Sequence, residues 1–307
     1  MKPVESRFTA SKDGNSLEEN EDASYTMSDK LSKEDGTYYY AVTDGATESS
    51  FAKEWARELA KAYGKGKLCD KSVFTSYLQK IQKNWQQDIE MKESSLPWYA
   101  LEKAQSGAFS SLIGLKICNQ GTWKAIAVGD SCLFQIRRDK LITKFPIEHS
   151  REFNNRPFLI SSLNSKNSEL AENTRFFEDK WEIGDSFYLM TDALSCWFLE
   201  ECEKGNSPWL ILNNSNNKKD FDYLIDKLRK HEKYEGDFKE KINSLINSLR
   251  LNKQIRNDDV TLIIAAAKCI RTQKQQEQIR WHHVNCQNCV KVCEFDASTK
   301  PSIFQCD

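Results

Sequence analysis

Acidic residues stand directly at the ends of apolar, strand-forming runs at several places in the sequence. Residues 38–42 form such a run, which leads through a threonine into Asp44. Residues 187–190 lead through a threonine into Asp192 in the same way. Because a strand end lies at the rim of a sheet, a carboxylate there is poorly placed for core packing. Further acidic residues at predicted strand ends or turns are Glu21, Asp22, Asp130 and Asp258.

This set of side chains suits a hard divalent cation. Carboxylates that gather at strand ends repel one another unless cations hold them together. None has a histidine nearby in the sequence, and all-oxygen coordination selects Mg²⁺ or Mn²⁺ over zinc. Two such ions can share a bridging water, lower its pKa and clamp phosphate oxygens for in-line attack. A lone aspartate is more often a turn residue or helix cap, but that does not explain the whole set.

The overall composition excludes several classes of function. The 307 residues carry 44 Lys and Arg against 45 Asp and Glu, a net charge of −1, so no global field attracts nucleic acid or an anionic membrane. No apolar run reaches the ~18 residues of a membrane span, and the N-terminus lacks a signal-peptide core. We expect a soluble, cytoplasmic monomer that binds neither nucleic acid nor membrane.

Helical spacing of apolar residues predicts the elements around the first acidic motifs. A helix follows Asp44, with Thr47 or Ser49 as its cap and Gly64 as its end. A second helix begins at about Lys71, because apolar residues recur there at helical spacing. Further helices are expected near Pro97 and over 194–203, 219–231 and 238–249.

Strand-like alternation predicts the remaining elements. Segments 107–118, 122–128, 131–137 and 140–145 read as consecutive strands of an antiparallel meander. The polar stretch 146–175 is expected to cross the surface as a flap. Strands return at 175–177, 186–191 and 260–266. Strands interrupted by helices predict an α+β fold in which helices pack on antiparallel sheets.

Six short motifs, in their order along the chain, resemble those of the metal-dependent protein phosphatases of the 2C type. The motifs are Asn20-Glu21-Asp22-Ala23, Val42-Thr43-Asp44-Gly45, Ser106-Gly107-Ala108, Val128-Gly129-Asp130-Ser131, Met190-Thr191-Asp192 and Asp258-Asp259-Val260-Thr261. The resemblance indicates a divergent, bacterial-type member with a catalytic domain over residues 1–268. It implies a four-layer αββα sandwich of two antiparallel β-sheets flanked by helices, with the metal site at one end.

The resemblance also implies a role for each acidic residue toward two Mn²⁺ or Mg²⁺ ions and a weaker third. Asp44 would bridge two ions, and the carbonyl of Gly45 would bind one of them. Asp192 and Asp258 would bind the other ion, and Asp130 would hold the third together with Asp192. In this interpretation Asp44, Asp192 and Asp258 are the catalytic residues, while Glu21 and Asp22 hold metal-bound waters or a metal directly.

The chain departs from the family pattern at positions near the site. Ala46 stands where some members carry a histidine that acts as general acid, and Thr47 replaces a second glycine. Ala193 and Asp259 replace the usual glycine and asparagine of the later motifs. The arginine that commonly precedes the Asn-Glu-Asp run and holds substrate phosphate is missing. Candidates to replace it are Arg7, Lys12 and Arg156.

The resemblance implies hydrolysis of phosphoserine or phosphothreonine by metal-activated water, without a covalent phospho-enzyme. The expected substrate is a phosphorylated signalling protein, the product of a serine/threonine kinase. One alternative is a pseudophosphatase that only binds phosphoproteins, favoured by the missing arginine. Another is a phosphatase of a small phosphorylated metabolite. The spacing Cys132-x5-Arg138 matches cysteine phosphatases, but the residues between alternate as a strand, so we reject that chemistry.

The cysteines divide into two groups. Five are scattered through apolar runs before residue 268 and are expected to be reduced core residues. The other five crowd the extension 269–307. Its Cys-x2-Cys pair with nearby His and Cys suits structural Zn²⁺, while reactive or simply reduced cysteines are the favoured interpretation. The candidate zinc ligands are His282, Cys286, Cys289 and Cys293.

Overall fold

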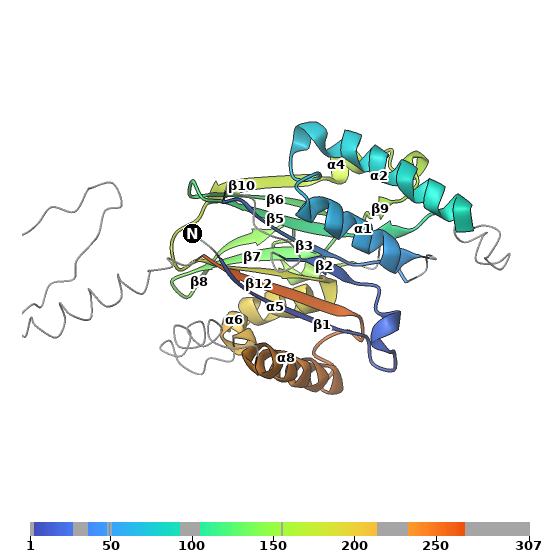
Figure 1. Ribbon diagram of the computed structural model, residues 1–307. Coiled ribbons are helices and arrows are strands. Elements are labelled where there is room, and N and C mark those ends of the chain that lie inside the picture. The colour runs from blue at the N-terminus through green and yellow to red at the C-terminus, as the bar shows by residue number, and fades with distance from the viewer. Residues whose placement is uncertain are drawn as a thin grey trace, which may run out of the picture. The chain divides into compact units, whose positions relative to one another are not determined.

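The computed structural model of the chain (Figure 1) describes residues 3–26, 36–47, 49, 51–92, 105–154, 156–213 and 233–267. The expected helices near Pro97 and over 219–231 lie outside the described residues. So do the extension 269–307 and its candidate zinc ligands His282, Cys286, Cys289 and Cys293. The domain boundary at 268 and the tail zinc site therefore stay predictions.

Two five-stranded antiparallel sheets form the centre of the fold. The first has the strand order β1-β12-β11-β7-β8 and the second the order β10-β6-β5-β3-β2. The strands of the first sheet are β1 (Val4–Ala10), β7 (Cys132–Arg137), β8 (Lys140–Phe145), β11 (Ser186–Met190) and β12 (Val260–Ala266). Those of the second are β2 (Ala23–Tyr25), β3 (Tyr38–Thr43), β5 (Leu112–Cys118), β6 (Thr122–Val128) and β10 (Arg175–Lys180).

Helices cover the outer face of each sheet (Figure 1). The second sheet is covered by α1 (Ala52–Gly64) and α2 (Lys71–Lys92), which pack with it into one apolar cluster. The first sheet is covered by α5 (Asp192–Glu203), α6 (Pro208–Leu212) and α8 (Lys233–Leu251). A third cluster, which includes Ile113 and Leu189, fills the space between the sheets. This is the expected α+β fold, a four-layer αββα sandwich.

The predicted single meander is wrong, because the chain changes sheets after β6. Strands β5 and β6 pair in the second sheet, and β7 and β8 pair in the first. The crossing occurs at Gly129, whose positive φ of 95° allows the turn. The pattern of apolar residues cannot reveal this change, because strands in both sheets are buried on both faces and look alike in sequence.

The polar stretch after β8 is only partly a surface excursion. Within it lie the turns η4 (Ser150–Glu152) and η5 (Asn164–Lys166), the short helix α4 (Leu170–Asn173) and strand β9 (Ile160–Ser161). Strand β9 pairs with β4 (Phe109–Ser110), and both of its residues are buried. The indole of Trp55 donates to the carbonyl of Ile160 at 2.9 Å, and Gln82 donates to that of Ser161 at 2.8 Å. The flap prediction is therefore wrong for this segment.

The start of α1 also differs from the expectation. The helix begins after Phe51, a residue with φ of 65°, and no side chain caps it. Ser49 instead donates to the carbonyl of Ala46, and Thr47 bonds to Lys12. The predicted end of this helix at Gly64 and the predicted start of α2 at Lys71 are confirmed.

Candidate functional site

Asp44 follows β3 and is held by its backbone. The amide of Ser111 donates to the carbonyl of Asp44 at 2.8 Å, and the amide of Asp44 donates to the hydroxyl of Ser111 at 3.1 Å. These two bonds fix the backbone at the strand end, so the carboxylate leaves the sheet at a defined place. Ser111 lies between β4 and β5, and sequence reasoning missed it because an isolated Ser-Ser pair carries no distinctive signal.

Gly45 is buried where two segments of backbone meet. A Cβ atom at this position would lie 2.8 Å from the carbonyl oxygen of Glu21 and 2.9 Å from that of Ala52. Contacts this short do not occur with a side chain, so only glycine fits. The close packing places the Asp44-Gly45 turn beside the acidic segment that begins at Glu21.

Asp130 lies in the turn where the chain changes sheets and is 6 % exposed. The next residue, Ser131, shares a hydrogen bond of 2.7 Å between its hydroxyl and that of Ser111. A Cβ at Gly129 would lie 2.8 Å from the Cβ of Ser111. Ser111 therefore links the Asp130 turn to the Asp44 turn. Burial, together with the charge of Asp192, raises the pKa of Asp130 to about 7.

Asp192 is the first residue of α5, where a carboxylate is favoured by the free amides of the helix start. One of its oxygens accepts a bond from the amide of Ala193, and the other lies 2.7 Å from the guanidinium of Arg256. Burial raises the pKa of Asp192, while the charge of Arg256 opposes that effect. Arg256 was not among the predicted site residues. Its only sequence signal is its place two residues before Asp258.

Asp22 precedes β2 and is 7 % exposed. The hydroxyl of Thr191 donates to its Oδ2 at 3.2 Å. Its Oδ1 is buried and has no hydrogen-bond partner among the described residues. Burial is the main cause of a pKa well above the ordinary value for this carboxyl, and the charges of Asp259 and Asp192 add to it.

The two neighbouring aspartates of the last acidic motif, Asp258 and Asp259, make different contacts. The carboxylate of Asp259 accepts from the amide of Lys12 at 2.8 Å and from that of Glu21 at 2.7 Å. It therefore fixes the loop that carries Glu21, although it was noted only as a departure from the family pattern. Asp258 is half-buried, and Arg250 donates to its backbone carbonyl at 2.6 Å.

The three candidates for the missing phosphate-binding arginine lie in different places. The ammonium of Lys12 is 3.9 Å from a carboxylate oxygen of Glu21 and 3.2 Å from the hydroxyl of Thr47, so it lies beside the acidic residues. Arg7 lines a cavity that also contains Asp22. Arg156 is exposed, and its backbone amide bonds to Asn154. Lys12 is thus the one of the three beside Glu21.

The acidic residues influence one another electrostatically. Burial raises the pKa of Asp44 well above the ordinary value, and the charges of neighbouring carboxylates raise it further. Burial likewise raises the pKa of Glu21, which the charge of Lys12 opposes. The carboxylates that act on Asp44 are Asp22, Asp192, Asp130 and Asp258.

The carboxylate oxygens of these acidic residues are the kind of ligand that divalent cations prefer. Buried carboxylates that repel one another, and a buried Oδ1 of Asp22 without a partner, both call for positive charge. In the described part of the chain, however, no three His, Cys, Asp or Glu side chains converge on one point as a ready ligand set. Arg256 supplies part of this positive charge through its ion pair with Asp192.

Comparison with known proteins identifies the fold and the family. The sequence matches the family described as Protein phosphatase 2C over residues 18–253, more than half of the chain. The chain belongs to the protein phosphatase 2C family. The match ends before Asp258 and leaves out both β1 and β12, which pair with each other. No curated protein matches the chain.

Solved structures of bacterial phosphatases share this fold. The Mycobacterium tuberculosis serine/threonine phosphatase PstP/Ppp is 12 % identical, with 88 % of this chain and 100 % of that chain covered and a TM-score of 0.53. The serine/threonine phosphatase of S. agalactiae is 12 % identical, with 87 % and 100 % covered and a TM-score of 0.51. At this level of identity the likeness shows that our chain has the protein phosphatase 2C fold.

Three further findings concern the cysteines and the helices of the described segments. Cys132 lies in β7, is buried, and has a pKa raised by that burial, so it is unsuited to act as a thiolate nucleophile. The expected free state of the cysteines before residue 268 is confirmed for the five in the described segments. No helix of the described segments is long and apolar enough to cross a membrane.

Proposed function

We propose that this member of the protein phosphatase 2C family hydrolyses phosphoserine and phosphothreonine in cytoplasmic signalling proteins, using Mn²⁺ or Mg²⁺. The observation that carries the proposal is the group of carboxylates around Asp44, which raise one another's pKa and include an unpartnered oxygen on Asp22. Such a group is unfavourable without cations and becomes favourable with them. Its expected substrates are the products of serine/threonine kinases.

The proposed ligands are Asp44, the carbonyl of Gly45, Asp192 and Asp258. Glu21 and Asp22 would hold metal-bound waters or a metal directly, and Asp130 would hold a third ion together with Asp192. When bound, divalent cations supply counter-charge to phosphate oxygens and lower the pKa of water. The chain's own contribution is to hold these groups: Ser111 fixes the backbone of Asp44, and Asp259 fixes that of Glu21. Because the acidic residues are already held in place, they need to move little during the reaction.

The cation that receives substrate phosphate is proposed to be Lys12. Its ammonium lies beside Glu21 and Thr47, at the rim of the acidic group. A lysine acts on phosphate as a point charge, whereas the family's arginine offers two parallel donors. We therefore expect weaker substrate binding than an arginine would give, with little effect on the chemical step.

The proposal is tested by release of phosphate from a phosphothreonine peptide, with Mn²⁺, with Mg²⁺ and with a chelator. We expect metal-dependent release that Asp44→Asn and Asp192→Asn each reduce by at least 100-fold. Asp179→Asn, an exposed aspartate in β10, is the matched control and should retain full activity. Wild-type activity in both site variants would refute the metal assignment.

A pseudophosphatase is the second candidate, favoured by the ion pair between Arg256 and Asp192, which occupies a carboxylate that the reaction needs. The same assay separates the two. Metal that binds measurably while no phosphate is released from peptide would favour the non-catalytic function. Release from a phosphorylated sugar but not from the peptide would instead favour a metabolite phosphatase.

A further inference from the structure

The loop 252–259 joins the end of α8 to β12 and carries three residues of the acidic site. Arg256 forms an ion pair in the site, Asp258 is a proposed metal ligand, and Asp259 accepts hydrogen bonds from the loop between β1 and β2. The conformation of this one loop therefore affects several parts of the site. A residue that holds the loop from outside it is a candidate for a role in positioning.

The start and the middle of the loop are fixed by the helix end and by the core. The amide of Lys253 donates to the carbonyl of Arg250 at 2.9 Å, in a turn that ends α8. Ile255 is then buried in the apolar cluster of the first sheet. Neither contact reaches the end of the loop next to β12, where the two aspartates lie.

Arg250, in the last turn of α8, holds that end of the loop. Its Nη2 donates to the carbonyl of Asp258 at 2.6 Å, across eight positions of the sequence. The amide of the same peptide unit, which belongs to Asp259, donates to Oδ1 of Asp258 at 2.9 Å. Because a peptide unit is planar, bonds to its carbonyl and to its amide together fix its rotation. The directions in which both carboxylates leave the backbone depend on that rotation.

Hydrogen bonds join this end of the loop to the loop between β1 and β2. Asp259 accepts from the amides of Lys12 and Glu21. The amide of Asp13 donates to Oδ1 of Asn257 at 2.6 Å, and Nδ2 of Asn257 donates to the carbonyl of Asp13 at 3.3 Å. A change in the backbone beside β12 should therefore reach the loop between β1 and β2 as well.

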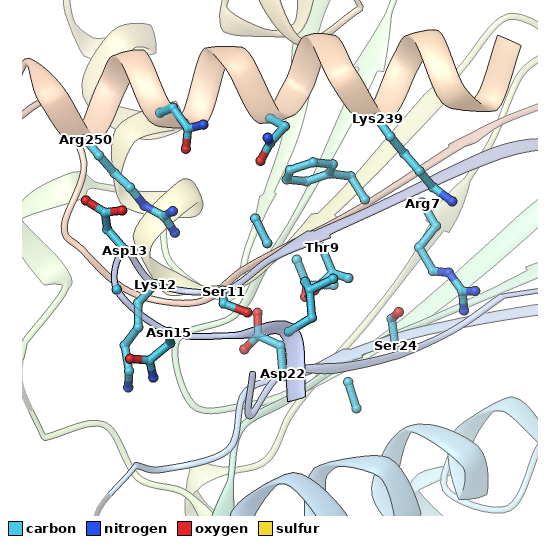
Figure 2. A pocket seen from close by; sticks show the side chains of 18 of the residues that line it. Arg7, Thr9, Ser11, Lys12, Asp13, Asn15, Asp22, Ser24, Lys239 and Arg250 are labelled. Atoms are coloured by element: carbon cyan, nitrogen blue, oxygen red, sulfur yellow. The ribbon is translucent and has the colours of Figure 1, made fainter. Parts of the chain in front are cut away.

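The surroundings of Arg250 suit a positioning role better than a purely stabilising one. Figure 2 shows its side chain beside Asp13. Burial of the guanidinium lowers the pKa of Arg250, and the charge of Asp13 opposes that effect. Its Nε is buried and has no hydrogen-bond partner among the described residues. A buried donor without a partner costs free energy, and an aliphatic side chain would fill the same space without that cost.

We propose that Arg250 is a positioning residue for the metal site. From α8 it fixes the peptide unit between Asp258 and Asp259. Through Asp259 it also holds the segment that carries Lys12 and Glu21. Replacing a group that holds metal ligands in place commonly lowers metal affinity by roughly 10- to 100-fold. The inference rests on the proposed function for the identity of the ligands, while the positioning itself can be measured in the metal-free protein.

The first test is amide hydrogen exchange, followed by NMR, of the full chain in a chelator. Arg250→Met and Arg250→Gln both remove the bond to the carbonyl, and Arg250→Lys retains the charge and a donor. Lys241→Met removes a cation from an exposed position of the same helix and is the control. The reporters are the amides of Lys12 and Glu21, which are distant from Arg250 in sequence. The amide of Leu115, in the buried strand β5, reports on the stability of the whole fold.

We expect Arg250→Met and Arg250→Gln to speed exchange at both reporters about tenfold, the control to change it less than twofold, and Arg250→Lys to restore part of the protection. Exchange at Leu115 should change less than twofold in every variant. The inference is overturned if both reporters exchange as in the wild type, or if Leu115 changes by the same factor as they do. It is also overturned if neither Arg250→Met nor Arg250→Gln folds, because the role of the arginine would then be structural.

The second test is calorimetric titration with Mn²⁺, which needs no assay of activity. Arg250→Met should bind Mn²⁺ about tenfold more weakly than the wild type, and Lys241→Met should bind it within twofold of the wild type. Equal affinity in Arg250→Met and a wild type that binds Mn²⁺ overturns the inference. A wild type that binds no Mn²⁺ counts against the proposed function, whereas faster exchange at Lys12 and Glu21 in the chelator still supports the positioning role.

Discussion

The guanidinium of Arg256 lies 2.7 Å from Oδ2 of Asp192, so a carboxylate expected to bind a metal ion already has a cationic partner from the chain itself. Asp192 is 7 % exposed and Arg256 is more open to solvent. A divalent cation that binds Asp192 through this oxygen must displace the guanidinium first. We therefore expect this ion pair to lower the affinity of the proposed site for metal.

Replacing Arg256 by glutamine should strengthen metal binding. The competing cation is removed while a polar side chain of similar length remains, and we expect Mn²⁺ to bind about tenfold more tightly, equivalent to ~1.4 kcal/mol. Calorimetric titration with Mn²⁺ measures this directly, without any assay of activity. Lys253→Gln, at an exposed position of the same loop, is the control. Weaker binding in Arg256→Gln would show that the arginine supports the metal site rather than competing with it.

Replacing Ser111 by alanine should destabilise both the Asp44 turn and the Asp130 turn. The change removes the hydroxyl that accepts from the amide of Asp44 and bonds to Ser131, and it leaves the part-buried amide of Asp44 without this partner. We expect the free energy of unfolding to fall by about 2 kcal/mol, as measured by urea denaturation. Ser131→Ala removes only one of these bonds, so its loss should be about half as large. Equal losses in the two variants would contradict the role given to Ser111.

The metal-free protein should lose stability as the pH rises from 4 to 8. Asp130 has a folded-state pKa of about 7, above the ordinary 3.8, so the folded state retains the proton longer than the unfolded state. Its stabilising contribution is complete below about pH 4 and is lost as the pH rises through 7. Thermal unfolding in a chelator at several pH values measures the effect. Asp130→Asn should show a smaller decline, and a flat profile in the wild type would contradict the raised pKa.

Replacing Gly45 by alanine should be costly because no space exists for a Cβ. The atom would lie 2.8 Å from the carbonyl oxygen of Glu21, so the Asp44 turn or the Glu21 segment must move. We expect a loss of roughly 2–3 kcal/mol in the free energy of unfolding. Gly236→Ala is the matched control, since Gly236 lies in α8 with open space around it. That control should stabilise the protein by up to about 1 kcal/mol, and similar losses in both variants would contradict the packing argument.

Sequence reasoning predicted the elements better than it predicted their connections. The spacing of apolar residues gave α2 and β12 with accurate bounds at Lys71 and at 260–266, because burial imposes those periods directly. The same pattern could not show that the chain changes sheets at Gly129, since strands of both sheets look alike in sequence. It also placed Ile160 on a surface flap, although Ile160 and the polar Ser161 are both fully buried in β9.

The residues of the candidate site were also only partly predictable from the sequence. Asp44, Asp192 and Asp130 could be selected because each carboxylate stands at the end of a strand-like run. The groups that position them or offset their charge, such as Ser111 and Arg256, could not be selected. Their roles depend on contacts between segments that lie far apart in the sequence, as in the bond between Ser111 and Ser131 or that between Asp259 and Lys12.

The pairing of β1 with β12 has a consequence for how the protein is made. Residues 4–10 pair with residues 260–266, so β1 has no partner strand until about 250 further residues have been added. Asp258 and Asp259 directly precede β12 and emerge from the ribosome with it. Asp259 fixes the loop that carries Glu21, so the acidic centre cannot be complete on a nascent chain. The proposed activity should therefore not arise before β12 has been synthesised, and until then β1 lacks the strand with which it pairs.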